Sequence, residues 1–340
     1  MKKRRNFLPF FFFLLIAACL LFPVRTYASG ADVGTSTGQF LKIASGARAA
    51  AMGEAFSAAA DDAFALDWNP AAATNIRYKS IALMHSMYLA DTSLSYLAYA
   101  ENTGDMGAWG ISAKYMSYGS IEGTSEHGEI TQNMSPYDLA LSIAFSCYIT
   151  GFNKDPEDRF IMGAAGKFIS SKISNSDNTL SADIGLLSPW FLGRHLRFSF
   201  AGQNLIGSMR FDKEENDLPM IIRAGSLYKV SDFLCFTADM ISYSDYDTVF
   251  AAGSELKLKL ISSREMPLEA ALRGGLNTRN KDEAVKGSNN FSLGAGLKFG
   301  DVYSFDYAYS PFGDLGNVHR FSLSVNFKKP VVRKKRLRGT

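Results

Sequence analysis

The chain has 340 residues, three cysteines and a formal net charge of +3, and 47% of its residues are hydrophobic. Both ends are basic and lack acids: the first 28 residues hold five of the 36 lysines and arginines, and residues 328–340 hold seven. The body between them therefore keeps 24 bases against 33 acids, a net charge of about −9, which excludes a basic nucleic-acid-binding face.

Residues 1–28 have the pattern of a signal peptide. Four consecutive bases, Lys2 to Arg5, precede a long apolar run, and small residues mark a cut after Ala28. A rival cut before Cys19 would leave a lipid-modified cysteine, but the apolar run continues past Cys19, which favours the later cut. Beyond the signal no stretch approaches the ~20 apolar residues of a transmembrane helix.

The segment 29–77 is rich in alanine and glycine, and we expect a compact, partly helical plug here. Asp61 or Asp62 can cap the turn that follows each of them, because a carboxylate accepts hydrogen bonds from free amides. Pro70, directly after Asn69, suits the first position of another helical turn. The alternative is that the two aspartates form an acid–base pair, but no histidine or serine motif supports it.

From residue 78 to residue 327 the hydrophobicity alternates with a period of two, most clearly over residues 137–149. Alternation assigns successive side chains to opposite faces of a sheet. A soluble β-sandwich would alternate too, but these segments reach ~10 residues, the length of a tilted membrane-crossing strand. An exported sheet that crosses lipid must close on itself. We therefore predict an all-β membrane protein, a 14-stranded antiparallel outer-membrane β-barrel with the plug in its lumen.

Fourteen strands are expected, at residues 79–88, 93–100, 107–118, 136–150, 159–173, 180–189, 195–206, 219–230, 233–243, 248–260, 268–277, 290–299, 302–309 and 319–327. The first two and the eighth have the weakest alternation. An even number leaves both ends of the barrel chain on the periplasmic side. There the basic residues 328–340 are either a disordered solubilising end or a tail that binds an anionic periplasmic partner. The opposite connections, such as 119–135, are mostly longer.

Fourteen strands enclose a lumen that their own side chains do not fill, and the plug is the segment of the right size to occupy it. Charges in a confined lumen are expected to be paired, since an unpaired buried charge is costly. We therefore predict a latch between plug and wall formed by Arg48, Asp61, Asp62, Asn69 and Pro70. The bases on the polar face of the strands are candidate partners: Lys167, Arg197, Arg223, Arg273, Lys298 and Arg320.

Signals of catalysis are absent from the sequence. The four histidines lack metal-ligand spacing, and neither a nucleophile elbow nor a Cys-x-x-Cys motif occurs. We expect no enzyme activity, no metal and no cofactor. Cys147 and Cys235 lie within apolar strand patterns, which favours buried or lipid-facing thiols over the alternative of a single disulfide.

Several motifs resemble known families. The order Ala55-Phe56-Ser57, Ala60-Asp61-Asp62-Ala63 and Asn69-Pro70-Ala71 is similar to the hatch of FadL-like outer-membrane barrels. The PorV/PorQ family is resembled more closely, through Gln39-Phe40-Leu41 and through strand motifs such as Asp306-Tyr307-Ala308-Tyr309. Glu54 and Ala72 stand where that family is expected to have glycines.

The PorV/PorQ resemblance implies a non-enzymatic barrel in the outer membrane of a didermic bacterium. Such a barrel serves protein secretion or surface attachment by binding partner proteins at its extracellular rim. The implied partners are outer-membrane lipid and secretion-system proteins or secreted cargo. The FadL-like resemblance implies an alternative, passive transport of a small hydrophobic ligand that passes when the plug moves.

Overall fold

The computed structural model describes residues 34–121, 123, 133–149, 158–173, 176–211, 214–263, 266–279, 290–300 and 302–327. The predicted signal peptide, with Cys19, and the predicted basic tail lie outside the described residues. So does most of the predicted loop 119–135.

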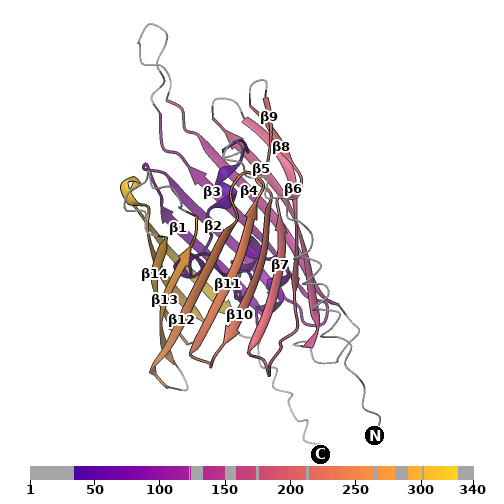
Figure 1. The fold of residues 1–340 in the computed structure, drawn as a ribbon, viewed down its shortest axis with the longest axis vertical. Helices are drawn as coiled ribbons and strands as arrows, with labels where there is room; N and C mark the ends of the chain where they lie inside the picture. The colour runs from indigo at the N-terminus through magenta and orange to yellow at the C-terminus, as the bar shows by residue number, and fades with distance from the viewer. Residues whose placement is uncertain are drawn as a thin grey trace, which may run out of the picture.

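Fourteen strands form a closed antiparallel barrel, in which the first strand pairs with the last (Figure 1). In chain order they are β1 Lys79–Met87, β2 Ser93–Asn102, β3 Ala108–Ser117, β4 Tyr137–Ile149, β5 Phe160–Lys172, β6 Ser176–Leu187, β7 Leu196–Gln203, β10 Ile221–Lys229, β11 Leu234–Tyr243, β12 Val249–Ile261, β13 Leu268–Asn277, β14 Phe291–Phe299, β15 Tyr303–Pro311 and β16 Asn317–Phe327. The predicted fold class and all fourteen strands are confirmed, with ends that differ by at most four residues.

A short hairpin outside the barrel sheet was not predicted. It consists of β8 Ser208–Phe211 and β9 Glu214–Asp217, which pair with each other between β7 and β10. Four-residue strands are too short to show a period in the sequence, and this region was expected to be a loop.

Side chains alternate between the lipid-facing surface and the interior as predicted. In β4, Ile143 is 63% exposed on the outside, whereas its neighbour Ala144 is 3% exposed on the inside. Apolar side chains thus face lipid, where a lysine or arginine near the mid-membrane would cost about 2–4 kcal/mol. Buried inward-facing bases include Lys114, Lys167, Arg197, Arg223, Arg273 and Arg320.

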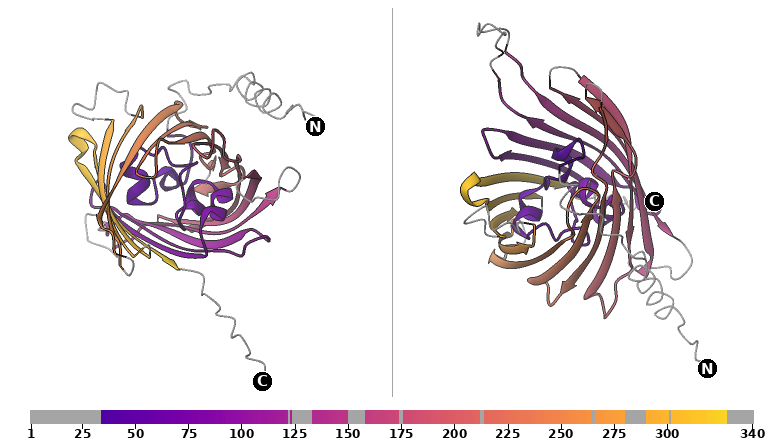
Figure 2. Two further views of the ribbon diagram at one scale, coloured as in Figure 1. Left: turned by 90° about the horizontal axis from the view of Figure 1, so that it is seen from below. Right: turned by 45° about the horizontal axis from the view of Figure 1, so that its top comes forward.

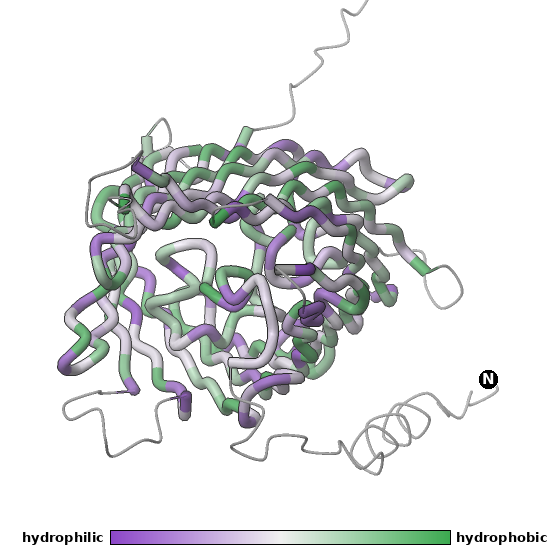
Figure 3. The backbone as a smooth tube through the Cα atoms, turned by 90° about the horizontal axis from the view of Figure 1, so that it is seen from above, coloured by the Kyte–Doolittle hydropathy of each residue, from purple (hydrophilic) through white to green (hydrophobic). Residues whose placement is uncertain are grey.

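The barrel encloses residues 39–76, which we call the plug (Figure 2). It contains four short helical turns: η1 Gln39–Lys42, α2 Ala47–Ala51, α3 Ala65–Trp68 and η2 Pro70–Asn75. Seen from above, the plug winds across the space inside the ring of strands (Figure 3). Large side chains among the many alanines, such as Phe40, Phe56 and Trp68, are almost fully buried.

Two wall glycines allow the plug backbone to touch the barrel. A Cβ atom on Gly163 of β5 would lie 2.4 Å from the amide nitrogen of Ala71, and one on Gly185 of β6 would lie 2.0 Å from Oδ1 of Asn69. Real Cβ contacts are not this short. The first turn of η2 therefore packs directly on wall backbone, which requires glycine at both positions.

Gly163→Ala should weaken the contact between plug and wall by about 1–3 kcal/mol, the usual cost of overpacking. The matched control is Gly166→Ala, three residues further along β5, where a Cβ would meet no atom within 4 Å. Denaturant unfolding of the purified barrel, followed by heat modifiability on gels, should give a lower midpoint for the first variant only. Equal midpoints would show that η2 does not press on β5.

Candidate functional site

The two rims of the barrel differ. We call the rim where β1 begins and β16 ends the terminal rim, and the opposite one, which carries the β8–β9 hairpin, the loop rim. Connections at the terminal rim include the short turns 103–107 and 230–233. In outer-membrane barrels short turns are periplasmic and longer loops are extracellular, which predicts that the loop rim faces the outside of the cell.

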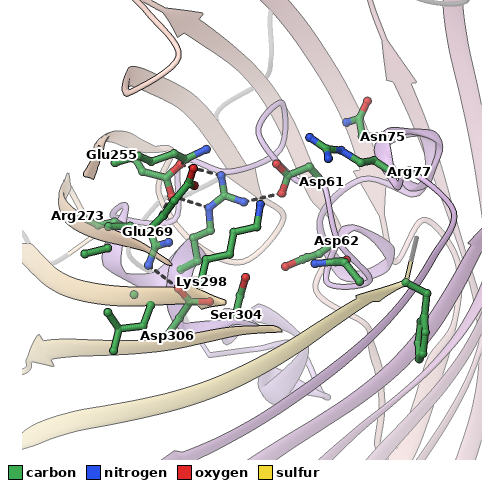
Figure 4. Close-up of a pocket in the computed structure, with 18 of the residues that line it drawn as sticks. Asp61, Asp62, Asn75, Arg77, Glu255, Glu269, Arg273, Lys298, Ser304 and Asp306 are labelled. Carbon is green, nitrogen blue, oxygen red and sulfur yellow. Dashed lines mark hydrogen bonds and ion pairs between the residues drawn. The ribbon is translucent and has the colours of Figure 1, made fainter. Parts of the chain in front are cut away.

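On the terminal-rim side of the plug, a continuous chain of ion pairs joins plug to wall. The Arg48 guanidinium donates to Glu255 of β12 through Nε (2.7 Å) and Nη2 (2.9 Å), and to Asp61 of the plug through Nη1 (2.5 Å). Arg273 donates to the same Glu255 and to Asp306, and each of these hydrogen bonds is 2.7 Å long. Figure 4 shows Asp61 and Glu255 on the two sides of the guanidinium that joins them.

Asp62 bonds both to its own turn and to the wall. Its Oδ1 accepts from the amide of Phe64 (3.0 Å), and its Oδ2 accepts from the hydroxyl of Ser324 in β16 (3.0 Å). Burial raises the pKa of Asp62 to about 6, and the neighbouring Asp61 carboxylate adds to this. The stabilising contribution of Asp62 therefore falls as the pH rises from 3.8, its ordinary pKa, to about 6.

Asn69 is fully buried and joins the plug to two wall strands. Its Nδ2 donates to the carbonyl oxygens of Leu186 in β6 (3.1 Å) and Phe200 in β7 (3.4 Å). Its Oδ1 accepts from the amide of Ala71, which caps η2, and Pro70 occupies the first position of that turn. All five residues proposed for the latch thus lie in the plug, and Arg48, Asp62 and Asn69 bond directly to the wall.

The sequence-based reasoning missed several wall partners of the plug. Glu54 pairs with Arg279 in the connection after β13 (2.6 and 3.0 Å), and Asp67 pairs with Lys114 of β3 (3.1 Å). Lys114 lies on the polar face of its strand, so alternation could have revealed it. Glu54 has φ +72°, which agrees with the glycine that the family resemblance leads one to expect there.

The wall bases that were expected to pair with plug acids have other partners. Lys167 pairs with Asp183 of the neighbouring strand (2.7 Å), and Arg273 with the wall acids described above, so that expectation is wrong for both. Nη1 of Arg197 donates to the side-chain Oδ1 of Asn75 in the plug (2.7 Å). Arg223 lies over the Trp68 ring, 4.7 Å from its centre. Wall acids thus neutralise Lys167 and Arg273, and the plug base Arg48 binds the wall acid Glu255.

Two cavities lie on the terminal-rim side of the plug, with volumes of about 320 and 520 Å³. Both are bordered by charged side chains, among them Arg48, Glu255 and Lys257. The described residues bring together no three His, Cys, Asp or Glu side chains that could hold a metal ion. Cys147 and Cys235 are free thiols, so the alternative of a disulfide between them is wrong.

No helix among the described residues is long and apolar enough to cross a membrane. A comparison with curated proteins finds no match. Among solved structures, the CymD monoaromatic hydrocarbon channel is similar with a TM-score of 0.50 and 12% identity, over 84% of this chain and 98% of that one. The Pseudomonas putida toluene transporter TodX has a TM-score of 0.49 and 12% identity, over 84% and 99%.

A FadL homologue from Pseudomonas aeruginosa has a TM-score of 0.46 and 13% identity, over 86% of this chain and 98% of that one. Likeness at such low identity concerns the fold alone. Residues 28–186 match the family model described as type IX secretion system protein PorV. The matched residues contain the plug, with Arg48, Asp61, Asp62, Asn69 and Pro70, the first five strands and β6 except its last residue. Over residues 28–186 the chain is therefore similar to the PorV family, and its strands form a closed antiparallel barrel of fourteen.

Proposed function

We propose that this barrel has no enzymatic activity and serves protein secretion or surface attachment by binding partner proteins at the loop rim. The partners would be components of a type IX secretion system or its secreted cargo. The match of residues 28–186 to the family model of the type IX secretion system protein PorV supports this class of function. The main observation in its favour is that the lumen is occupied by a plug that is bonded to several wall strands.

The lumen is poorly suited to passing a small hydrophobic molecule. Ion pairs and hydrogen bonds tie the plug to β3, β6, β7, β12 and β16. Cavities for apolar ligands are mostly lined by apolar side chains. The two cavities beside the plug are instead bordered by charged groups, such as Arg48 and Glu255. A plug bonded to five wall strands, with charged cavities beside it, favours a function at the barrel surface over transport through the lumen.

The β8–β9 hairpin is a candidate contact surface at the loop rim. It is anchored, because the amide of Thr37 donates to the carbonyl of Asp217 (3.1 Å) and Met209 is buried beneath it. Glu214 and Glu215 are exposed on its second strand. A fixed, acidic projection of this kind can steer and orient a partner of complementary charge.

A disulfide between plug and wall separates the two functions. The hydroxyl oxygens of Ser57 in the plug and Ser199 in β7 lie 2.7 Å apart, so Ser57→Cys/Ser199→Cys should form a bond that locks the plug. Cys147 and Cys235 are replaced by serine in the background. In a bacterium with a type IX secretion system that relies on this chain, the locked barrel should still support secretion and surface display, because rim contacts need no plug movement.

The outcome is read against two controls. The single variant Ser57→Cys shows the effect of substitution without the lock, and a reducing agent shows that of releasing it. Glu214→Lys/Glu215→Lys should reduce cargo display without changing heat modifiability, whereas Asp105→Lys, in a turn of the terminal rim, should not. If the locked barrel is folded but loses secretion until it is reduced, the plug must move and the rim proposal fails.

A further inference from the structure

A buried arginine near the loop rim has no counter-ion among the described residues. Arg320 of β16 is 3% exposed, and its Nε has no hydrogen-bond partner among the described residues. Its Nη1 makes one long hydrogen bond, to the hydroxyl of Ser310 (3.3 Å), and the guanidinium lies 5.9 Å from the centre of the Tyr88 ring. A buried charge without a partner is strongly disfavoured. Something should therefore balance Arg320 in the folded protein.

The nearest other charges do not balance it. Arg279 and Glu54 border the same cavity as Arg320, and they bind each other through two hydrogen bonds of 3.0 and 2.6 Å. Arg279 also donates to the hydroxyl of Tyr243 (2.7 Å). Among the described residues, one carboxylate thus faces two guanidinium groups, which gives the lining of this cavity one excess positive charge.

The cavity has room for a small ion. Its volume is about 30 Å³, and it lies between Ala50 and Glu54 of the plug and wall residues of β14, β15 and β16. A cavity needs about 10–15 Å³ on this measure to hold one water molecule. Two waters or one small anion would fit. Ser310 and Arg320 both line it, and they carry a hydroxyl and an Nε–H without a partner among the described residues, which are suitable donors to an anion.

We propose that this cavity binds one small monovalent anion, a halide or a short carboxylate, which pairs with Arg320 and strengthens the contact between plug and wall. The site is separate from the ion pairs around Arg48 and does not depend on the proposed rim function. The same negative charge could come from the chain itself, because Asp282 and Glu283 belong to the connection between β13 and β14. These two acids lie outside the described residues, so the experiment has to separate the two sources.

The test uses bromide as the probe. Crystals of the purified mature barrel grown in sodium bromide should show an anomalous peak in the cavity beside Arg320. In parallel, the temperature at which the folded gel band converts to the unfolded one should be higher in bromide than in gluconate, an anion too large for the cavity, at equal ionic strength. Arg320→Gln should lose both the peak and the shift, whereas Arg320→Lys, which keeps the charge, should retain at least part of the shift.

Several outcomes would overturn the proposal. A wild-type barrel without a bromide peak and without a difference between the two salts has no anion site. A peak and a shift that appear only in Asp282→Asn/Glu283→Gln show that the chain's own carboxylate occupies the cavity. If Arg320→Gln does not fold, the same two measurements on wild type and on Ser310→Ala test the proposal. The difference in conversion temperature between bromide and gluconate should be smaller in Ser310→Ala than in wild type. If this difference is unchanged and wild type shows no bromide peak, the anion binds elsewhere and the proposal fails.

Discussion

Glu255→Ala should leave a folded barrel whose lumen conducts ions. Glu255 is fully buried and is the wall acid that holds both Arg48 of the plug and Arg273 of β13. Removing one partner of a buried ion pair costs about 3–5 kcal/mol, because the remaining charge stays buried without compensation. Arg48 is then released from the wall, and the plug should open toward the terminal rim. Single-channel conductance in planar bilayers measures this directly.

Asp61→Ala is the matched control, because it removes the other partner of Arg48. The Asp61 side chain is 52% exposed, and exposed ion pairs contribute only about 0–1 kcal/mol. Its conductance should stay near that of wild type. Heat modifiability shows whether Glu255→Ala is folded. If it is folded and conducts no more than Asp61→Ala, the chain of ion pairs does not hold the plug. The Asp62 and Asn69 contacts would then account for its retention.

Ile143→Arg should impair assembly of the barrel strongly, whereas Ser142→Arg should be tolerated. Ile143 lies at the middle of β4 and faces lipid, where arginine costs about 2–4 kcal/mol. Ser142 precedes it, points into the lumen and is only partly buried, so a longer polar side chain can reach water. The measurement is the fraction of membrane-inserted, heat-modifiable protein.

The cross-strand neighbour of Ser142 is Lys167, so some repulsion is expected in the Ser142→Arg variant. This repulsion should cost less free energy than placing an arginine in lipid, because Lys167 is already neutralised by Asp183. Ser142→Gln provides a version of the control without added charge. Equal loss of inserted protein in Ile143→Arg and Ser142→Arg would show that the two faces of β4 are not chemically distinct.

The sequence by itself determined the barrel. Period-two alternation is a local property, so it locates each strand and assigns its faces without knowledge of the partners. Even the weakly alternating strands, such as β1 and β10, lie where the sequence predicts them. The small residues and acids of residues 39–76 likewise distinguish the plug from the wall, because a segment rich in alanine and lacking alternation cannot continue the sheet.

Only the tertiary structure decided which charges meet. Arg48 and Glu255 are 207 positions apart in the chain, and no local pattern relates them. Composition indicates that lumen charges are paired, but several arginines and lysines compete for each acid. Distance alone selects among them: Lys167 takes Asp183 from the next strand, and Arg279 reaches Glu54 because that residue turns with a positive φ. Arg320 was found to have no counter-ion among the described residues for the same reason, since an unpaired charge depends on which groups are close in space.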